Sequence, residues 1–240
     1  YEQGVELTSA AQAGKLYGFG SPIHQMMRIL RPVSGGGVGT GVVVAAYPQK
    51  ADGASIPSTT ESTVTGNATA NAMHYLQING KTSIDGSNYA FSVVTGDTPT
   101  IIAGKIADAI SSVISSPMKA VSAVGVVTST SKYSGLTANE IDVQVLTDGN
   151  PVGVSYGVAV TNAATGVVDL SDALTAMHGV WNTLVVNPYN TTTILDLLES
   201  TNGTPEGGNG NFSAENWKPF VALTGENSNV LSDYTTPATT

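Results

Sequence analysis

The sequence contains no cysteine and few charged residues, and both shortages limit what the protein can do. Without cysteine there are no disulfides, no thiolate metal ligands and no cysteine nucleophile. Charged residues make up 11% of the 240 residues, about half the usual share. Gly, Ser, Thr and Asn take their place. This composition favours a β-rich protein whose surface is polar without being strongly ionic.

Basic residues are scarcest in the second half of the chain. The formal net charge is −9, and residues 133–240 contain only Lys218 against eleven acidic residues. A surface of that sign repels phosphate, and no Lys/Arg cluster with interleaved aromatics occurs, so we expect no nucleic-acid partner and no membrane partner. The longest apolar runs, Gly41–Tyr47 and Val180–Val186, have the length of strands and are far shorter than the roughly 20 residues of a membrane span.

Capping residues and apolar periodicity predict a series of helices and strands. Ser9 and Ser21 are suited to cap two helices, and Thr98 a third, with Pro22 and Pro99 at first helical positions. We expect helices over residues 10–17, from 22 to just before Pro32, 98–113, 170–178 and 191–200. We expect strands over residues 42–47, 73–78, 89–94, 120–128, 141–146, 155–161, 181–186 and 220–223.

The order of these elements predicts a mixed α/β (α+β) fold with two domains. Residues 52–69 lose their apolar content to Ser, Thr, Gly and Asn, which indicates an exposed connection. Strands alternate with helices in residues 1–55 and 150–240, and this alternation favours a mainly parallel α/β layer. We therefore predict one α/β domain from residues 1–55 plus 150–240, with a β-rich domain of residues 56–149 inserted into it.

The glycine-rich run Gly35–Gly41 could in principle approach a phosphate group through its backbone amides. A dinucleotide-binding glycine loop follows a strand and opens a helix, whereas this run follows a predicted helix and enters a predicted strand. No Gly-Lys-Ser/Thr sequence is present either. We interpret the run as a linker and predict no cofactor.

Neither the three histidines nor Ser21 belongs to a recognisable metal-binding or catalytic motif. His24, His74 and His178 lie on three different predicted elements without a nearby ligand partner, so we interpret them as ordinary surface or half-buried residues. Gly18 and Ser21 do not form a nucleophile elbow, because the serine is needed as a helix cap.

The carboxylate pairs also have a structural interpretation. Asp169/Asp172 and Asp196/Glu199 open or flank polar helix faces. The apolar groups, by contrast, are expected to face a core; these are Met26, Met27, Leu195, Leu197 and Leu198. We therefore predict no catalytic, cofactor-binding or metal-binding residues, and we predict that the protein is not an enzyme.

Residues 9–26 contain a motif that can be compared with known families. Residues 9–26 read Ser-Ala-Ala-Gln-Ala-Gly-Lys-Leu-Tyr-Gly-Phe-Gly-Ser-Pro-Ile-His-Gln-Met. This resembles the Ser-x-x-Gln-Ala-x-x-Leu-aromatic-Gly-x-Gly-Ser-x-Ile-x-x-Met segment of Mu-type phage tail sheath proteins. The likeness continues in the same order to about residue 200, with Ala138 and Asn190 as local departures. The matching segments are residues 66–70, 76–80, 95–98, 135–141 and 188–189.

The resemblance implies a structural subunit of a contractile tail sheath. Such a subunit polymerises with copies of itself around the tail tube and contracts to drive the tube through the host envelope. It also implies a tail tube protein and a baseplate as partners, location in the virion, and synthesis in the bacterial host cytoplasm. Neighbouring subunits would be joined by terminal arms that add strands to one another. We expect this chain to be an internal piece without those arms, and to be monomeric.

Two other functions are open from the residues themselves. The Gly/Ser/Thr/Asn-rich composition suits a surface-exposed adhesion or carbohydrate-binding module, which would present Trp181 or Trp217 in a shallow groove. An enzyme would instead bring His and acidic side chains together at the strand ends.

Overall fold

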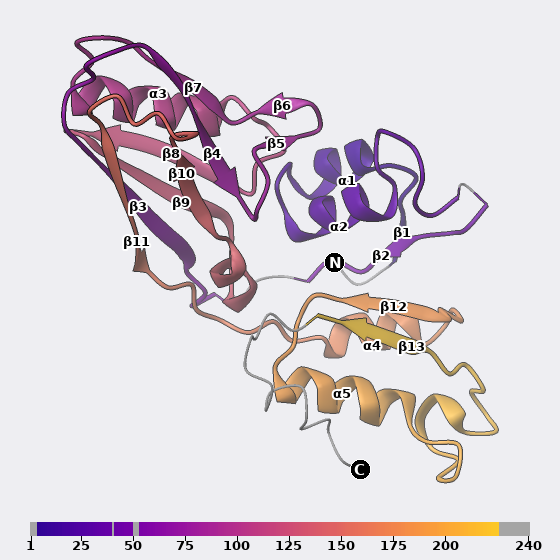
Figure 1. Ribbon diagram of the computed structural model, residues 1–240. Coiled ribbons are helices and arrows are strands. Elements are labelled where there is room, and N and C mark those ends of the chain that lie inside the picture. The colour runs from indigo at the N-terminus through magenta and orange to yellow at the C-terminus, as the bar shows by residue number, and fades with distance from the viewer. Residues whose placement is uncertain (1–3, 40, 50–52, 226–240) are drawn as a thin grey trace. The chain divides into compact units, whose positions relative to one another are not determined.

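The computed structural model describes residues 4–39, 41–49 and 53–225 (Figure 1). Helices and strands are both well represented, so the expected mixed fold is confirmed as α+β. The helices are α1 (Ala10–Tyr17), α2 (Pro22–Leu30), α3 (Pro99–Ser111), α4 (Ser171–Met177) and α5 (Thr192–Asn202), with short 3-10 helices η1 (Leu136–Glu140) and η2 (Gly210–Phe212). The strands are β1 (Val5–Glu6), β2 (Ala45–Ala46), β3 (Pro57–Thr65), β4 (Ala72–Ile78), β5 (Ser83–Ile84), β6 (Ser87–Asn88), β7 (Ala90–Val93), β8 (Met118–Ala123), β9 (Val126–Ser134), β10 (Val143–Leu146), β11 (Ser155–Asn162), β12 (Leu184–Asn187) and β13 (Val221–Thr224).

The described residues fall into two compact units. The acidic unit contains residues 4–6, 44–49 and 168–225, and the β-rich unit contains residues 7–39, 41–43 and 53–167. This grouping differs from the expected one, because it places residues 7–43 with the β-rich part of the chain. The insertion of a domain at residues 56–149 into a domain of residues 1–55 plus 150–240 stays a prediction.

Two antiparallel sheets and one helix form the centre of the β-rich unit. A four-stranded sheet has the order β11-β3-β9-β8, and a three-stranded sheet has the order β10-β4-β7. Helix α3 packs along β8 and also touches β9, β7 and β3 (Figure 1). The helix therefore joins the two sheets into one core.

The sequence of α3 explains this position. Thr98 is at the N-cap and Pro99 at the first helical position, as predicted. Ile102, Ile106 and Ile110 follow at four-residue spacing, so they share one face, and all three are fully buried. Their partners in the core include Leu76, Ile78, Phe91, Val93, Val127 and Val143 from both sheets.

The prediction of an exposed connection over residues 52–69 is wrong, because this stretch contains β3. Ser58, Thr60 and Ser62 alternate along this strand with their side chains buried. The buried face of the strand is lined by hydroxyls instead of large apolar groups, so the usual apolar alternation is absent from the sequence. The strand that follows residue 150, β11, was expected in a parallel layer; it pairs antiparallel with β3 instead.

Paired turn residues explain most of the hairpins. Asn79–Gly80 and Asp85–Gly86 have positive φ at both positions, as the sequence predicted for tight turns. The expected strand over residues 120–128 is wrong, because the Val124–Gly125 pair also has positive φ and divides it into β8 and β9. A β-branched residue such as Val124 rarely takes this conformation, so no turn was predicted there.

Helices α1 and α2 have the predicted caps, and α2 contacts loop residues of its own unit. Ser9 Oγ accepts the Gln12 amide at 3.2 Å and Ser21 Oγ accepts the His24 amide at 3.3 Å. From α2, the Gln25 side chain donates to the Ser115 carbonyl at 2.7 Å. The Arg28 guanidinium donates from Nε to both oxygens of Asp85 at 2.9 Å, and its Nη2 lies 2.8 Å from Oδ1.

The acidic unit contains the one parallel strand pair among the described strands, β12 with β13. Leu170 and Leu174, at the start of α4 and in it, and Ile194 and Leu198 of α5 lie in its core. The prediction that Leu197 and Leu198 face a core is confirmed. The expected buried strand over residues 42–47 is reduced to β2, which pairs antiparallel with β1. Val42 and Val43, assigned to that strand from the sequence, are exposed.

Substitutions on the hydroxyl-lined face of the four-stranded sheet test this packing. Ser129 Oγ is buried without a hydrogen-bond partner among the described residues, whereas Ser58 Oγ donates to the Ala138 carbonyl at 2.8 Å. Ser129→Ala should raise the free energy of unfolding by up to about 1 kcal/mol, and Ser58→Ala should lower it by about 1 kcal/mol. Urea unfolding of both variants measures this difference. Equal destabilisation by both substitutions would contradict the hydrogen-bond assignment.

Candidate assembly surface

Strands β12 and β13 form a small sheet. One face of this sheet packs against the core to which helices α4 and α5 contribute. Leu184 lies opposite Val221, and Val186 lies opposite Leu223, in the parallel register. Val185, between Leu184 and Val186, points the other way and packs against the helical core. Because side chains alternate along a strand, the four paired residues share the face that points away from that core.

This outer face is apolar and exposed. Leu184 is 54% exposed, Val186 38%, Val221 61% and Leu223 53%. Parallel strands are normally buried on both faces, and a sheet of only two strands is marginal in isolation. Scattered apolar residues need no explanation, but four that adjoin on one open sheet suit a protein interface. We call these four residues the β12–β13 face.

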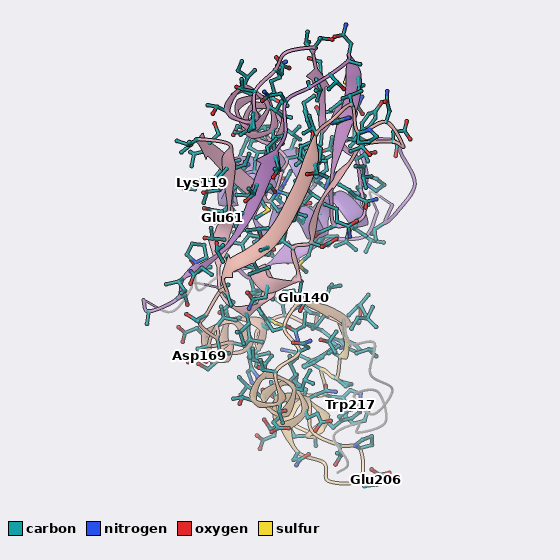
Figure 2. All side chains as sticks on the ribbon, turned by 60° about the vertical axis from the view of Figure 1, so that its left-hand side comes forward. Glu61, Lys119, Glu140, Asp169, Glu206 and Trp217 are labelled. Carbon is teal, nitrogen blue, oxygen red and sulfur yellow. The ribbon has the colours of Figure 1, made fainter. Side chains whose placement is uncertain are left out.

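The unit that contains the β12–β13 face is acidic. Its described ranges contain one basic residue, Lys218, against seven Asp and Glu residues. Asp169 and Glu206 are among the acids on the surface of this unit (Figure 2). A partner for this face therefore has to tolerate or neutralise negative charge.

The two tryptophans, suggested above for the shallow groove of a carbohydrate-binding module, have contacts within the acidic unit. Both are exposed, but the indole N–H of Trp181 is already bonded to the Pro219 carbonyl at 2.8 Å. The Trp217 ring packs edge-on against Phe212. A pocket of about 10 Å³ in this unit is lined by Leu174, Met177, His178, Val180, Asn182, Thr201, Asn211, Lys218 and Phe220, without either tryptophan. It has room for about one water molecule.

The glycine-rich run closes the end of a helix. Gly35, Gly36 and Gly37 have positive φ, and the Val38 amide donates to the Leu30 carbonyl at 2.7 Å. A Cβ at Gly37 would lie 2.3 Å from that carbonyl oxygen. The loop therefore caps the C-terminal end of α2, where the helix dipole is negative and disfavours phosphate.

Two of the three histidines are buried, so their interpretation as surface or half-buried residues is wrong. His24 Nδ1 accepts the Gly20 amide at 3.0 Å, and its ring packs edge-on against Phe19. His74 Nε2 donates to the Asn150 carbonyl at 2.9 Å. His178 is exposed, as expected.

His74 belongs to an aromatic cluster between the two sheets of the β-rich unit. Its Nδ1 lies 2.6 Å from the hydroxyl of Tyr156, and Phe91 meets both rings edge-on. Burial raises the pKa of the Tyr156 hydroxyl. Both ring nitrogens of His74 thus have a hydrogen-bond partner within the core, which indicates a structural role for this residue.

The four acidic candidate residues lie at the start of a helix or on exposed helix positions. Asp169 accepts the Ser171 amide at 2.9 Å at the start of α4, and this hydrogen bond lowers the pKa of its carboxyl group. Asp172, Asp196 and Glu199 are exposed on their helices. In the part of the chain that the structure describes, no three His, Asp or Glu residues come together in a metal-binding group.

The segment quoted from residues 9–26 forms structural contacts throughout. The Gln12 side chain accepts the amide of Thr8, the residue before the cap, at 2.8 Å, and the Gln12 amide donates to Ser9 Oγ. Gly20 has φ of +88°, and a Cβ there would lie 2.2 Å from the Ser116 carbonyl oxygen. The residue types of this segment are those that the helix caps and a close backbone approach require.

Comparison with known proteins decides the relationship. No protein-family profile compared with the chain matches it. Over 201 residues it is 27% identical to the Mu-like prophage FluMu tail sheath protein of Haemophilus influenzae, a match that covers 82% of this chain and 39% of that protein. The chain is related to a Mu-type tail sheath protein. The resemblance seen in the sequence is confirmed, and the chain spans about two fifths of the length of this sheath relative.

The residues of the β12–β13 face were not singled out from the sequence. Residues 181–186 were expected to form an apolar strand in a layer, which hid the fact that one side stays uncovered. The available signal was the alternation of Leu184 with Val186 and of Val221 with Leu223. Among the described helices, none is both long and apolar enough to cross a bilayer.

Protonation of His24 should destabilise the β-rich unit. Burial, with the nearby Arg28 charge as a second cause, lowers the pKa of His24 below its ordinary value of about 6.5. The unfolded chain therefore binds this proton at higher pH than the folded chain, and stability should fall as the pH drops below about 6.5. Urea unfolding between pH 7.5 and 5 measures the effect. His24→Asn should flatten this slope and His178→Asn should leave it; a slope unchanged by His24→Asn would contradict the assignment.

Charge on the β12–β13 face should spare the fold. Leu184→Lys combined with Leu223→Lys should change the free energy of unfolding by less than about 1 kcal/mol, because both side chains are more than half exposed. Leu198→Ala, in the buried core of the same unit, should cost about 2 to 5 kcal/mol. Thermal unfolding compares the two variants. A large loss of stability in the double lysine variant would show that the face is covered within the chain itself.

Proposed function

We propose that this chain is part of the structural subunit of a contractile phage-type tail sheath. The observation that carries the proposal is the 27% identity over 82% of the chain to a tail sheath protein. The subunit polymerises with copies of itself around a tail tube and contracts to drive the tube through the host envelope. It acts within the virion after synthesis in the bacterial host cytoplasm, and its further partners are the tube protein and the baseplate.

The structure supports this proposal through its surfaces. The β12–β13 face offers four apolar side chains on a sheet whose edges pair with no other described strand, which suits docking by a neighbouring subunit. The residues weighed as catalytic or cofactor-binding instead cap helices, fill the core or lie on solvated helix faces. A structural role without catalysis needs no more than this.

The oligomeric state of this chain alone differs from that of the proposed assembly. The sheath relative is much longer than this chain, and subunits of such a sheath are tied together by terminal arms. We propose that this chain alone is a monomer at micromolar concentration, because the β12–β13 face by itself offers a contact of only weak, transient size. Like-charge repulsion between acidic units further discourages association at low salt.

Electron microscopy tests the function directly. The full-length protein that contains these residues should form hollow, striated tubes, and this chain alone should form none. Sedimentation of the chain alone across micromolar concentrations should give a monomer. A tight closed dimer together with no tubes from the full-length protein would favour the adhesion or carbohydrate-binding alternative instead.

A further inference from the structure

Five turns in the described residues place a non-glycine residue with positive φ directly before a glycine with positive φ. In three of them the first residue is Asn or Asp, and these types tolerate the conformation. In the other two it is a valine, Val124 or Val152, each with φ of +44°. A β-branched residue disfavours this conformation, so each valine needs a contact that offsets the strain.

Val152 has such a contact within the chain, whereas Val124 is left in solvent. Val152 is 8% exposed and belongs to the core of the β-rich unit. Val124 is 88% exposed and lies at the turn between β8 and β9. The backbone of this turn is held in place, because β8 and β9 pair up to the turn and the Gly125 carbonyl accepts the Val64 amide at 2.8 Å. A fixed backbone therefore presents the Val124 side chain outward.

More apolar surface adjoins Val124 on β8. Ala120 packs against the core, whereas Val121 is 69% exposed and Ala123 is also exposed. Because side chains alternate along a strand, Val121 and Ala123 share the face that points away from the core. We call Val121, Ala123 and Val124 the hairpin tip. Backbone strain of this kind collects at functional sites, and exposed apolar side chains there suit a protein contact.

The hairpin tip lies in a stretch of chain without carboxylates. Residues 109–139, which include β8 and β9, contain Lys119 and Lys132 and no acidic residue. Lys119 is exposed (Figure 2) and lies on the same face of β8 as Val121. Glu61 is on β3, which β9 separates from β8. A partner surface of negative charge therefore complements the hairpin.

The β12–β13 face has these complementary properties. Its four residues are apolar and exposed, and the described ranges of its unit contain one basic residue against seven acidic residues. The hairpin tip and the β12–β13 face are different surfaces, so a contact between them in two copies is head-to-tail. A head-to-tail contact that does not close into a ring repeats along an open helix, which is the symmetry of the proposed sheath.

We propose that the hairpin tip of one copy docks on the β12–β13 face of the next copy, with Val124 against its four apolar side chains. This inference rests on the proposed function, and it names the surface that the neighbouring subunit presents. A contact of this size buries far less than the roughly 1,200 Å² of a stable interface, so it is weak in dilute solution. In an assembly, other contacts raise the effective concentration of the tip.

Val124→Asn tests whether the valine is kept for a contact outside the chain. Asparagine accepts the turn conformation, so the thermal unfolding midpoint of this chain should rise by about 2 to 4 °C. Val152→Asn is the matched control with the same φ, and it should lower the midpoint because residue 152 is buried. In the full-length protein, Val124→Asn should raise the concentration at which tubes form at least about threefold.

Single cysteines test the partner surface in this chain, which contains no cysteine. A Val124→Cys chain is mixed with an isotopically labelled Val221→Cys chain at about 1 mM, the range of a weak contact. A short thiol crosslinker is added, and mass spectrometry separates mixed dimers from homodimers. We expect at least about tenfold more mixed dimer than when Ser155→Cys, at an exposed position of β11, replaces Val124→Cys. Adding Lys119→Glu to the Val124→Cys chain should reduce the mixed yield at least about threefold.

These readouts separate the inference from the proposed function. Mixed yields equal to those of Ser155→Cys, or a lower unfolding midpoint for Val124→Asn, would overturn the hairpin contact. Crosslinks from Val124→Cys to a tube protein in place of a second copy would also overturn it. Tubes that form from full-length Val124→Asn at an unchanged concentration would remove the contact and leave the sheath function. Absence of tubes from the unaltered full-length protein would remove the sheath function, and the mixed yield of this chain then decides the contact.

Discussion

Strand β3 pairs with a neighbour on each of its edges, and the architecture of the β-rich unit depends on these two ladders. On one side lies β9, and on the other lies β11, which begins ninety residues after β3 ends. Because β3 holds β11 in the sheet, residues 150–167 belong to the same compact unit as residues 53–149. The aromatic cluster of His74, Phe91 and Tyr156 then forms between the two sheets.

The buried face of this sheet is unusually rich in hydroxyl groups. Ser58, Thr60, Ser62, Ser129 and Ser131 are all buried there. The isoleucines of α3, Ile102, Ile106 and Ile110, supply part of the apolar core beside this face, together with apolar residues of both sheets. The cost of the hydroxyl groups is that Ser62 and Ser129 have no hydrogen-bond partner among the described residues, a burden of about 1 to 3 kcal/mol per group that tight packing has to offset.

Local signals in the sequence predicted the helices well and the strand pairing poorly. Caps at Ser9, Ser21 and Thr98 and the isoleucine spacing of α3 depend on neighbouring residues only, and the structure agrees with them. Strand β3 was missed because its buried residues are hydroxyls, which resemble a linker in the sequence. The pairing of β11 with β3 depends on contacts across ninety residues, which no local pattern contains.

The candidate surface was harder to predict than the family. The ordered motif of residues 9–26 identified the relationship because its residues are fixed by caps and by the close approach at Gly20. The β12–β13 face depends instead on what does not cover it, and an uncovered strand has the same sequence pattern as a covered one. Burial of that face therefore links the fold of this chain to its proposed assembly.

An electron microscopy map of the full-length protein in assembled tubes tests this account most directly. The account predicts that Leu184, Val186, Val221 and Leu223 are exposed in the isolated chain and buried in the tube, against residues of the same or a neighbouring subunit. A map in which these four side chains face solvent in the assembled tube would contradict it.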